Sequence, residues 1–136
     1  ITLGTPRTMD EVIDKSMPRI LKSYQDKADF GVFAAYLINS EKYIGWFQFD
    51  KDKEFKDSIE IGCRLKKQYW GNCYATEVTT FLCKLGIKIG KIIVARVMIE
   101  NLALIRVMEK AGMKFVKEFW GYYEPHSGSP FVIYKI

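Results

Sequence analysis

The run of residues 92–99 constrains the fold more than any other segment, because it is apolar throughout except for Arg96. Such a run is typical of a strand that is buried on both faces of a sheet. The rest of the chain must therefore supply neighbouring strands and covering layers. With 49% apolar and 15% aromatic residues among 136, the chain has enough apolar surface for one core. We predict a single domain over residues 1–136.

The first helical pattern covers residues 9–24. It follows a capping box, in which the Thr8 hydroxyl and the Glu11 carboxylate satisfy the first free N–H groups. Pro18 lies inside the pattern and predicts either a kink or a second helix start capped by Ser16.

Two further helices follow later in the chain. One is predicted over residues 75–85, with Gly86 in the left-handed position that ends a helix. The other is capped by Asn101 and runs to residue 111, where Gly112 ends it in the same way.

The remaining apolar segments predict strands, and residues 50–57 predict a charged, exposed connection between two of them. Antiparallel hairpins come first and a β-α-β crossover follows, which indicates an α+β fold: a mixed sheet with helices packed on it. The predicted strands are 30–38, 43–49, 58–65, 92–99, 114–120 and 131–136.

Several classes of protein are disfavoured by composition. Cys63, Cys73 and Cys83 form no Cys-x-x-Cys pair, so neither a disulfide framework nor a metal site is expected, and a reducing cytoplasm is the simplest location. His126, the single histidine, lies in a Gly/Ser/Pro-rich loop, and the sequence has no Gly-x-Ser-x-Gly motif. A hydrolase with a His-dependent catalytic triad is therefore disfavoured. No apolar run is long enough to span a membrane, and no secretory signal is evident. The net charge of +5 is modest and dispersed, so nucleic-acid binding is disfavoured.

The loop between the strand at 58–65 and the following helix can bind an anion. It contains Lys66, Lys67 and Gly71 and opens directly into the helix. Backbone N–H groups at a helix start, together with its partial positive charge, favour a phosphate there. An ordinary strand-to-helix turn is the alternative, and no nucleotide-binding glycine motif is present.

Two stretches around this loop match a known pattern. They are Ile59-Glu60-Ile61-Gly62-Cys63-Arg64-Leu65 and Gln68-Tyr69-Trp70-Gly71-Asn72-Cys73-Tyr74-Ala75-Thr76-Glu77. Together they resemble the acetyl-CoA-binding core of the GNAT N-acetyltransferases, which carry Arg/Gln-x-x-Gly-x-Gly/Ala at this place. Gln68 and Gly71 match the first two positions, and Cys73 replaces the last Gly or Ala.

A second block supports the resemblance. Residues 95–101 and 105–113 are similar to the Asn-to-Glu-Lys-x-Gly-Phe block of the branch that acetylates the N-termini of ribosomal proteins. Leu104 stands where that branch usually has Ser, and Met108 stands where some members have a Tyr that acts as an acid.

The resemblance implies a GNAT fold in which the parallel strands 58–65 and 92–99 splay apart to admit acetyl-CoA as co-substrate. Backbone of the first strand would hold the pantetheine arm, and the loop N–H groups would hold the pyrophosphate. The implied acetyl-CoA-binding residues are Ile61, Gly62, Cys63, Arg64, Leu65, Gln68, Tyr69, Trp70, Gly71, Asn72, Cys73, Tyr74, Ala75 and Asn101.

The implied reaction is direct transfer of acetyl from the thioester to a primary amine, either a protein N-terminus or a small molecule. Glu60 is the candidate general base, and an ordinary solvent-facing glutamate is the alternative. Tyr122, Tyr123 and Tyr134 are the candidate acids. Cys63 is interpreted as a buried thiol rather than a nucleophile.

Two points stay open at this stage. A non-catalytic acyl-CoA-binding module with the same fold is the alternative to an enzyme. The first strand and helix of the family are also not evident before Thr5. We therefore expect a trimmed or reduced chain whose first sheet edge is absent or supplied by a partner, as in a homodimer.

Overall fold

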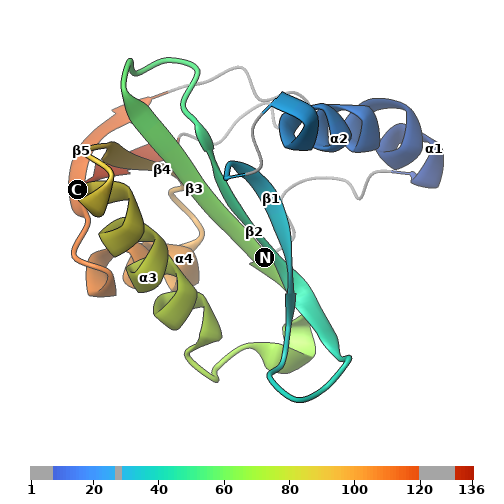
Figure 1. The fold of residues 1–136 in the computed structure, drawn as a ribbon. Coiled ribbons are helices and arrows are strands. Elements are labelled where there is room, and N and C mark those ends of the chain that lie inside the picture. Colours follow the sequence, from blue (N-terminus) through green and yellow to red (C-terminus); the bar gives the residue numbers. More distant parts are fainter. Residues whose placement is uncertain (1–7, 27–28, 120–130) are drawn as a thin grey trace.

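The structure is a computed structural model that describes residues 8–26, 29–119 and 131–136. Figure 1 shows a sheet with two helices on one face and an N-terminal helical arm that projects beyond its edge. The elements are α1 (Met9–Glu11), a π-helical segment (Val12–Ser16), α2 (Met17–Asp26), β1 (Gly31–Tyr36), β2 (Tyr43–Lys51), β3 (Ser58–Leu65), a 3-10 turn (Lys67–Tyr69), α3 (Tyr74–Lys88), β4 (Ile92–Met98), α4 (Leu102–Lys110), β5 (Lys114–Phe119) and β6 (Phe131–Lys135).

The sheet is mixed, as the sequence predicts. Its strands lie in the order β1-β2-β3-β4-β6-β5. Every neighbouring pair is antiparallel except β3 and β4, which are parallel and are connected by α3. The α+β fold class is therefore confirmed. In the described part of the chain, no helix is both long and apolar enough to cross a membrane.

The parallel pair β3–β4 separates soon after it begins. Its register covers only Ser58 with Ile92, Ile59 with Ile93 and Glu60 with Val94. Beyond Glu60, β3 stays paired with β2 as far as Leu65, and β4 stays paired with β6 as far as Met98. The two strands thus part after their first residues, which is the splayed arrangement expected of them.

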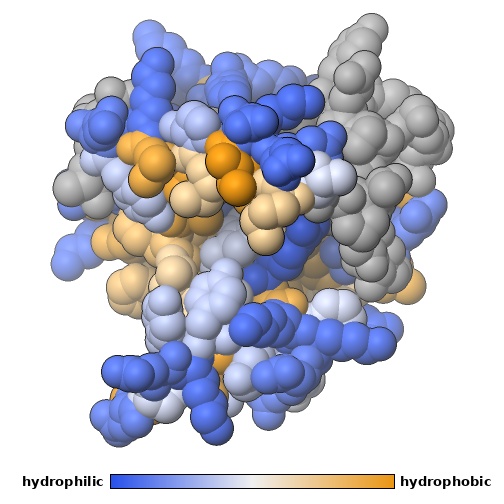
Figure 2. Space-filling model, turned by 90° about the vertical axis from the view of Figure 1, so that its right-hand side faces the viewer, coloured by the Kyte–Doolittle hydropathy of each residue, from blue (hydrophilic) through white to orange (hydrophobic). Residues whose placement is uncertain are grey.

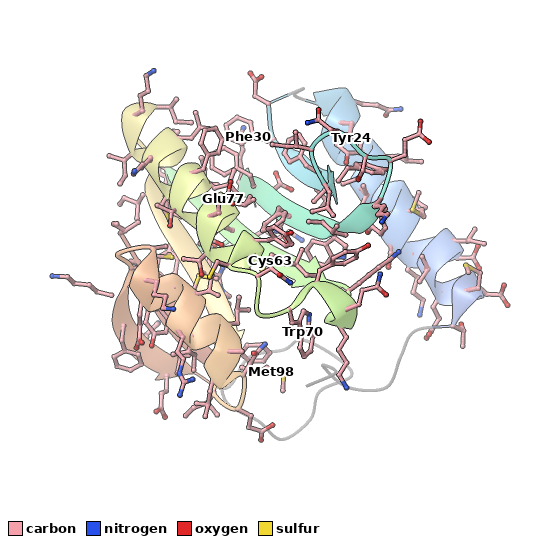
Figure 3. All side chains as sticks on the ribbon, turned by 90° about the horizontal axis from the view of Figure 1, so that it is seen from below. Tyr24, Phe30, Cys63, Trp70, Glu77 and Met98 are labelled. Atoms are coloured by element: carbon pink, nitrogen blue, oxygen red, sulfur yellow. The ribbon has the colours of Figure 1, made fainter. Side chains whose placement is uncertain are left out.

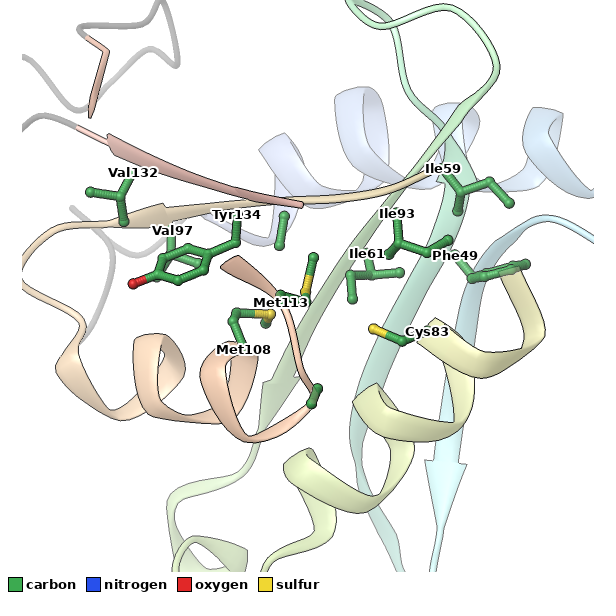
Figure 4. Close-up of a cluster of buried hydrophobic side chains, with 12 residues drawn as sticks. Phe49, Ile59, Ile61, Cys83, Ile93, Val97, Met108, Met113, Val132 and Tyr134 are labelled. Carbon is green, nitrogen blue, oxygen red and sulfur yellow. The ribbon is translucent and has the colours of Figure 1, made fainter. Parts of the chain in front are cut away.

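One face of the sheet is covered by α3 and α4, and the core lies between. Figure 4 shows Cys83 of α3 close to Ile61, Ile93 and Phe49, while Met108 of α4 lies under the other half of the sheet. Ile59, Ile93, Cys83 and Met108 have 0–1% of their surface exposed. Alternation along β3 therefore directs Ile59 and Ile61 to the helices and Glu60 to the opposite face.

The N-terminal helix begins at the predicted capping box. The Glu11 N–H donates to Thr8 Oγ1 at 3.2 Å, and the Thr8 N–H donates to Glu11 Oε2 at 3.0 Å. The helix continues through Pro18 without a second start. The turn before Pro18 is widened into a π-helical segment, which accommodates a residue that has no N–H and crowds the preceding turn.

The predicted end of α3 at Gly86 is wrong, because the helix continues to Lys88. Gly90, which follows the C-cap Ile89, has a φ of +72° and takes the left-handed position predicted for Gly86; the Lys91 N–H donates to the Gly86 carbonyl at 2.9 Å. Gly86 instead permits close packing, since a Cβ there would lie 2.0 Å from Cδ1 of Ile93. The prediction for Gly112 is confirmed: its φ is +89°, and α4 ends in the same hydrogen-bond pattern.

We predict that Gly86→Ala destabilises the protein by about 1–3 kcal/mol through overpacking, although Ala is favoured over Gly in a helix by ~1 kcal/mol. Ile93→Val removes the clashing Cδ1 and costs about 0.5–1.5 kcal/mol alone. The free energy of unfolding of the double variant should therefore fall by less than the sum of the losses in the two single variants, as measured by urea unfolding. Additive losses would contradict close packing at this contact.

Candidate functional site

The loop that follows β3 is held in shape by its own side chains. Trp70 donates from Nε1 to the Leu65 carbonyl at 2.8 Å, and Asn72 donates from Nδ2 to the carbonyls of Tyr69 and Trp70 at 3.3 and 3.2 Å. The Lys66 N–H donates to the Ile44 carbonyl on β2 at 2.8 Å. The loop is therefore a defined structure whose backbone direction is set before any ligand arrives.

This loop ends in a set of free donors at the start of α3. The first hydrogen bond of the helix runs from the Glu77 N–H to the Cys73 carbonyl at 3.0 Å. The N–H groups of Tyr74, Ala75 and Thr76 precede it, and the Cys73 side chain makes no capping bond. A Cβ on Gly71 would meet no atom within 4 Å. Gly71, Asn72 and Cys73, which lead into these donors, are exposed, so an anion can approach them from solvent.

Cys73 has an unusual backbone conformation for its residue type. Its φ and ψ are 62° and 4°, in the left-handed region, and its side chain is exposed. Glycine is the residue that adopts this region without steric cost. Only the folded backbone reveals that the Cys73 position is strained.

Beside the loop, β3 has an edge that β4 does not pair. Residues 61–65 are paired with β2 on one side, whereas the register with β4 ends at Glu60. Figure 3 views this end of the molecule and labels Cys63 on β3, Trp70 in the loop and Met98 at the end of β4. Burial raises the pKa of the Cys63 thiol to about 11. The thiol is thus protonated at neutral pH, as expected of an unreactive group, but Cys63 is half-buried rather than buried as predicted.

Glu60 lies at the point where the strands separate, on the face opposite α3 and α4. Its Oε1 is 3.2 Å from Nη1 of Arg96, the one charged residue in the apolar run 92–99. Arg96 also donates to Asp52 and, at 2.9 Å, to Glu54. Three carboxylates therefore surround a guanidinium whose side chain is only 6% exposed.

Asp52 corrects the prediction that residues 50–57 form an exposed connection. Its side chain is fully buried, and its Oδ1 accepts from the N–H groups of Glu54 and Phe55 at 2.8 and 2.6 Å. The connection thus folds back onto the sheet to reach Arg96. The sequence signal for this contact was the single arginine in a strand predicted to be buried, because a buried charge requires a partner of opposite charge.

Burial acts on the two carboxylates with different outcomes. For Glu60, burial raises the pKa and exceeds the opposing effect of Arg96, so that the pKa is above its ordinary value. For Asp52, burial also disfavours ionisation, but the hydrogen bonds from Arg96, Phe55 and Glu54 outweigh it, and its pKa is lowered. Glu60 is therefore the carboxyl that retains the greater affinity for a proton.

The candidate acids are not brought beside Glu60 in the described residues. Tyr134 packs in the core with Ile61 and Met108, on the helix side of the sheet. Its hydroxyl donates to Glu109 Oε1 at 3.2 Å; burial, the larger cause, and the Glu109 charge raise its pKa. Tyr122 and Tyr123, like His126, lie outside the described residues.

Asn101 caps α4, as predicted. Its side-chain oxygen accepts from the Leu104 N–H at 3.2 Å. This bond places the start of α4 directly after the end of β4. Asn101 and the loop 66–73 therefore stand at the starts of the two helices that flank the separated strands.

Comparison with known proteins identifies related folds. A model of the family described as acetyltransferase (GNAT) domain matches residues 2–114. A GNAT acetyltransferase from Bacillus anthracis is 29% identical, with a TM-score of 0.69, and the match covers 77% of this chain. The chain spans only 64% of the length of that protein. No curated protein matches the sequence.

Two more distant structures share the fold. A ribosomal-protein-alanine N-acetyltransferase from Brucella melitensis is 12% identical over 90% of this chain and 76% of its own, with a TM-score of 0.71. A Salmonella typhimurium protein solved with its cofactor acetyl-CoA is 14% identical over 88% of this chain and 72% of its own, with a TM-score of 0.69.

We predict that Asp52→Asn lowers the free energy of unfolding at pH 7 by about 3 kcal/mol, since it breaks a buried ion pair. Because folding lowers the pKa of Asp52, its contribution is present above the ordinary value of 3.8 and is lost as pH falls through the folded value. The difference from wild type should shrink in acid, as followed by urea unfolding across pH. Glu54→Gln, at a side chain 53% exposed, is the control and should cost under about 1 kcal/mol.

We also predict that Cys73→Gly stabilises the protein by about 0.5–1 kcal/mol, because the left-handed strain that it removes exceeds the added chain entropy of glycine. Cys73→Ala keeps the Cβ and should give no gain. Thermal unfolding of the two variants decides the point, and equal melting temperatures would argue against strain at this position.

Proposed function

The chain belongs to the GNAT acetyltransferase family, and on that premise we propose that it binds acetyl-CoA and transfers the acetyl group to a primary amine. The observation that carries the proposal is the separation of β3 and β4 after Glu60. It leaves a strand edge unpaired by β4 beside a loop that leads into the first N–H groups of α3, which precede the first hydrogen bond of that helix. The acceptor amine, the reaction and the site residues are all part of the proposal.

The residues of this chain fit the two ends of the co-substrate. Backbone of residues 61–65 offers strand-type hydrogen bonds to the amide-containing pantetheine arm. Within residues 68–75, the N–H groups of Tyr69 and Trp70 already donate to the carbonyls of Lys66 and Lys67 at 2.9 and 3.1 Å. The remaining backbone N–H groups, with the positive end of α3 and the nearby Lys66 and Lys67, suit the diphosphate. Asn101 would border the same opening from α4. Acetyl-CoA itself supplies the activated thioester.

We propose Glu60 as the general base. It lies at the point where the strands part, and its raised pKa brings it nearer to the operating pH, where a base is most effective. Arg96 would act as a positioning residue, because its 3.2 Å contact orients the Glu60 carboxylate. The amine would then approach from the face opposite α3 and α4. A backbone N–H within residues 61–63 would stabilise the developing oxyanion.

The proton donor to the departing thiolate is proposed among Tyr122, Tyr123 and Tyr134. The Tyr134 hydroxyl would first have to leave Glu109, to which it donates at 3.2 Å. This requirement favours the other two tyrosines.

We propose a protein N-terminus as the preferred acceptor, with a small amine as the alternative. The second sequence block resembles the branch that acetylates ribosomal proteins, and the Brucella melitensis structure carries that name. An α-amine, with a reference pKa of about 8, also loses its proton more easily than a lysine, at about 10.4.

A cytoplasmic location agrees with three free cysteines. A homodimer agrees with the exposed apolar residues on α1 and α2.

The test combines binding and turnover. Calorimetric titration with acetyl-CoA should show binding, and thiol release should accelerate with peptides that have free N-termini. No binding at millimolar acetyl-CoA would contradict the proposal. Binding without turnover on any amine or peptide would instead support the non-catalytic acyl-CoA-binding module.

We predict that Glu60→Gln lowers kcat by about 10²- to 10⁴-fold, the usual contribution of a general base, with little change in acetyl-CoA affinity. Wild-type activity should fall as pH decreases through the raised pKa of Glu60, because protonation removes the base. That acidic limb should be missing in the variant. Glu54→Gln changes another carboxylate on Arg96 and serves as the control; equal losses in both variants would refute the assignment.

A further inference from the structure

Two charged side chains beside the proposed base are buried. On the face drawn in Figure 2, hydrophilic residues project outward over much of the surface. The side chains of Asp52 and Arg96, in contrast, are only 0% and 6% exposed. A buried ion pair is costly to desolvate and is weak evidence for a role in stability alone. Its place beside Glu60 points to a second role.

Asp52 fixes the position of Arg96 from the connection between β2 and β3. Its Oδ2 accepts from Nη1 of Arg96, and its Oδ1 accepts from Nη2 at 3.3 Å. Such a two-point contact fixes the plane of the guanidinium as well as its location. Asp52 Oδ1 also accepts from the N–H groups of Glu54 and Phe55. The Asp52 N–H donates to the Ser58 carbonyl at 2.9 Å, so the carboxylate that holds Arg96 is itself held by backbone.

Two carboxylates share Nη1 of Arg96. This nitrogen donates to Asp52 Oδ2 and lies 3.2 Å from Glu60 Oε1. Asp52 is fully buried and meets both terminal nitrogens, whereas the Glu60 side chain is 19% exposed and meets the guanidinium from the opening between the strands. A single arginine beside a glutamate lowers the pKa of the glutamate, which makes it a poorer base. Here a second, buried carboxylate balances the charge of the arginine.

We propose that Asp52 is a positioning residue for the proposed base. By binding Arg96 through both carboxylate oxygens, Asp52 holds the guanidinium where it orients Glu60, and it offsets the positive charge that Glu60 would otherwise meet. Arg96 then orients the Glu60 carboxylate without turning it into an inert member of an ion pair. This role rests on the proposed function, since Glu60 is the base of that reaction.

The charges around Glu60 agree with this role. Burial is the largest cause of the raised pKa of Glu60; Arg96 opposes the rise, and the Asp52 charge adds to it. The exposed Lys53 opposes it more weakly than Arg96 does. Glu54 accepts from Nη2 of Arg96 but is 53% exposed, so solvent screens its charge. Two further charged residues lie on neighbouring strands: Asp50, the cross-strand partner of Glu60 on β2, and Lys135 on β6, the partner of Val94.

The first experiment removes the charge of Asp52 and keeps the shape of its side chain. The pH profile of kcat/KM is measured with acetyl-CoA and one peptide acceptor, whose own amine titrates equally with every variant. In Asp52→Asn, the acidic limb should move to lower pH by about one unit, because Glu60 then faces an uncompensated guanidinium. A purely structural role would lower the rate without moving the limb.

Glu54→Gln is the matched control, because it also removes one carboxylate from Arg96. Its acidic limb should move by less than about 0.3 unit, since an exposed charge is screened. Equal shifts in the two variants, or an unmoved limb in Asp52→Asn, would overturn the proposal.

A second variant guards against misfolding of Asp52→Asn. All variants are compared in the same sucrose concentration, which favours the folded state, and circular dichroism confirms the fold at each pH. Arg96→Lys keeps the buried positive charge. Its single ammonium should remain with the buried Asp52, so that Glu60 loses its cation and the acidic limb moves to higher pH. A limb that stays in place or moves to lower pH would show that the cation belongs to Glu60 and would overturn the proposal.

A direct measurement separates the role of Asp52 from the proposed activity. Carboxyl ¹³C NMR follows the protonation of Glu60 without turnover, and the Glu60 resonance is identified by its disappearance in Glu60→Gln. The pKa of Glu60 should fall by about one unit in Asp52→Asn and by less than about 0.3 unit in Glu54→Gln. An unchanged pKa in Asp52→Asn would overturn the proposal even in an active enzyme. The expected shifts without any acetyl transfer would uphold the action of Asp52 on Glu60 and contradict only the proposed function.

Discussion

The short parallel contact between β3 and β4 determines the rest of the architecture. The antiparallel strands β1–β3 and β4–β6 form two halves of the sheet, and these halves share only the pairs from Ser58–Ile92 to Glu60–Val94. Both faces reinforce this joint. On one face, Gly86 lets α3 approach Ile93 closely. On the other, Arg96 of β4 binds Glu60 of β3 and Asp52 of the preceding connection.

Because the joint is confined to one end, the strands diverge at the other. This divergence leaves the edge of residues 61–65 unpaired by β4 and sets the loop and the start of α3 beside it. The ion pairs of Arg96 stabilise the contact between β3 and β4 and also hold Glu60, the proposed base. Arg96 therefore contributes both to the stability of the fold and to the proposed activity. We therefore expect changes at Arg96 to affect both properties.

Local signals in the sequence predicted local structure well. The capping box of Thr8 and Glu11, the cap at Asn101, the glycine end at Gly112 and the limits of β3 depend on residues close in the chain, and all are confirmed. The predictions for Gly86 and Asp52 failed for one reason. Each residue is positioned by a distant partner, Ile93 for Gly86 and Arg96 for Asp52. Periodicity and turn propensity carry no information on such contacts.

By itself, the sequence determined the elements, the mixed sheet and the resemblance to one family, because apolar spacing and a motif of consecutive residues express these directly. Tertiary structure alone decided where β3 and β4 part, that Cys73 adopts a left-handed backbone, and which carboxylates share Arg96. It also decided that Met9, Ile13 and Met17 of the N-terminal helical arm are exposed. The physical reason is that register, burial and charge pairing depend on distances between residues far apart in the chain.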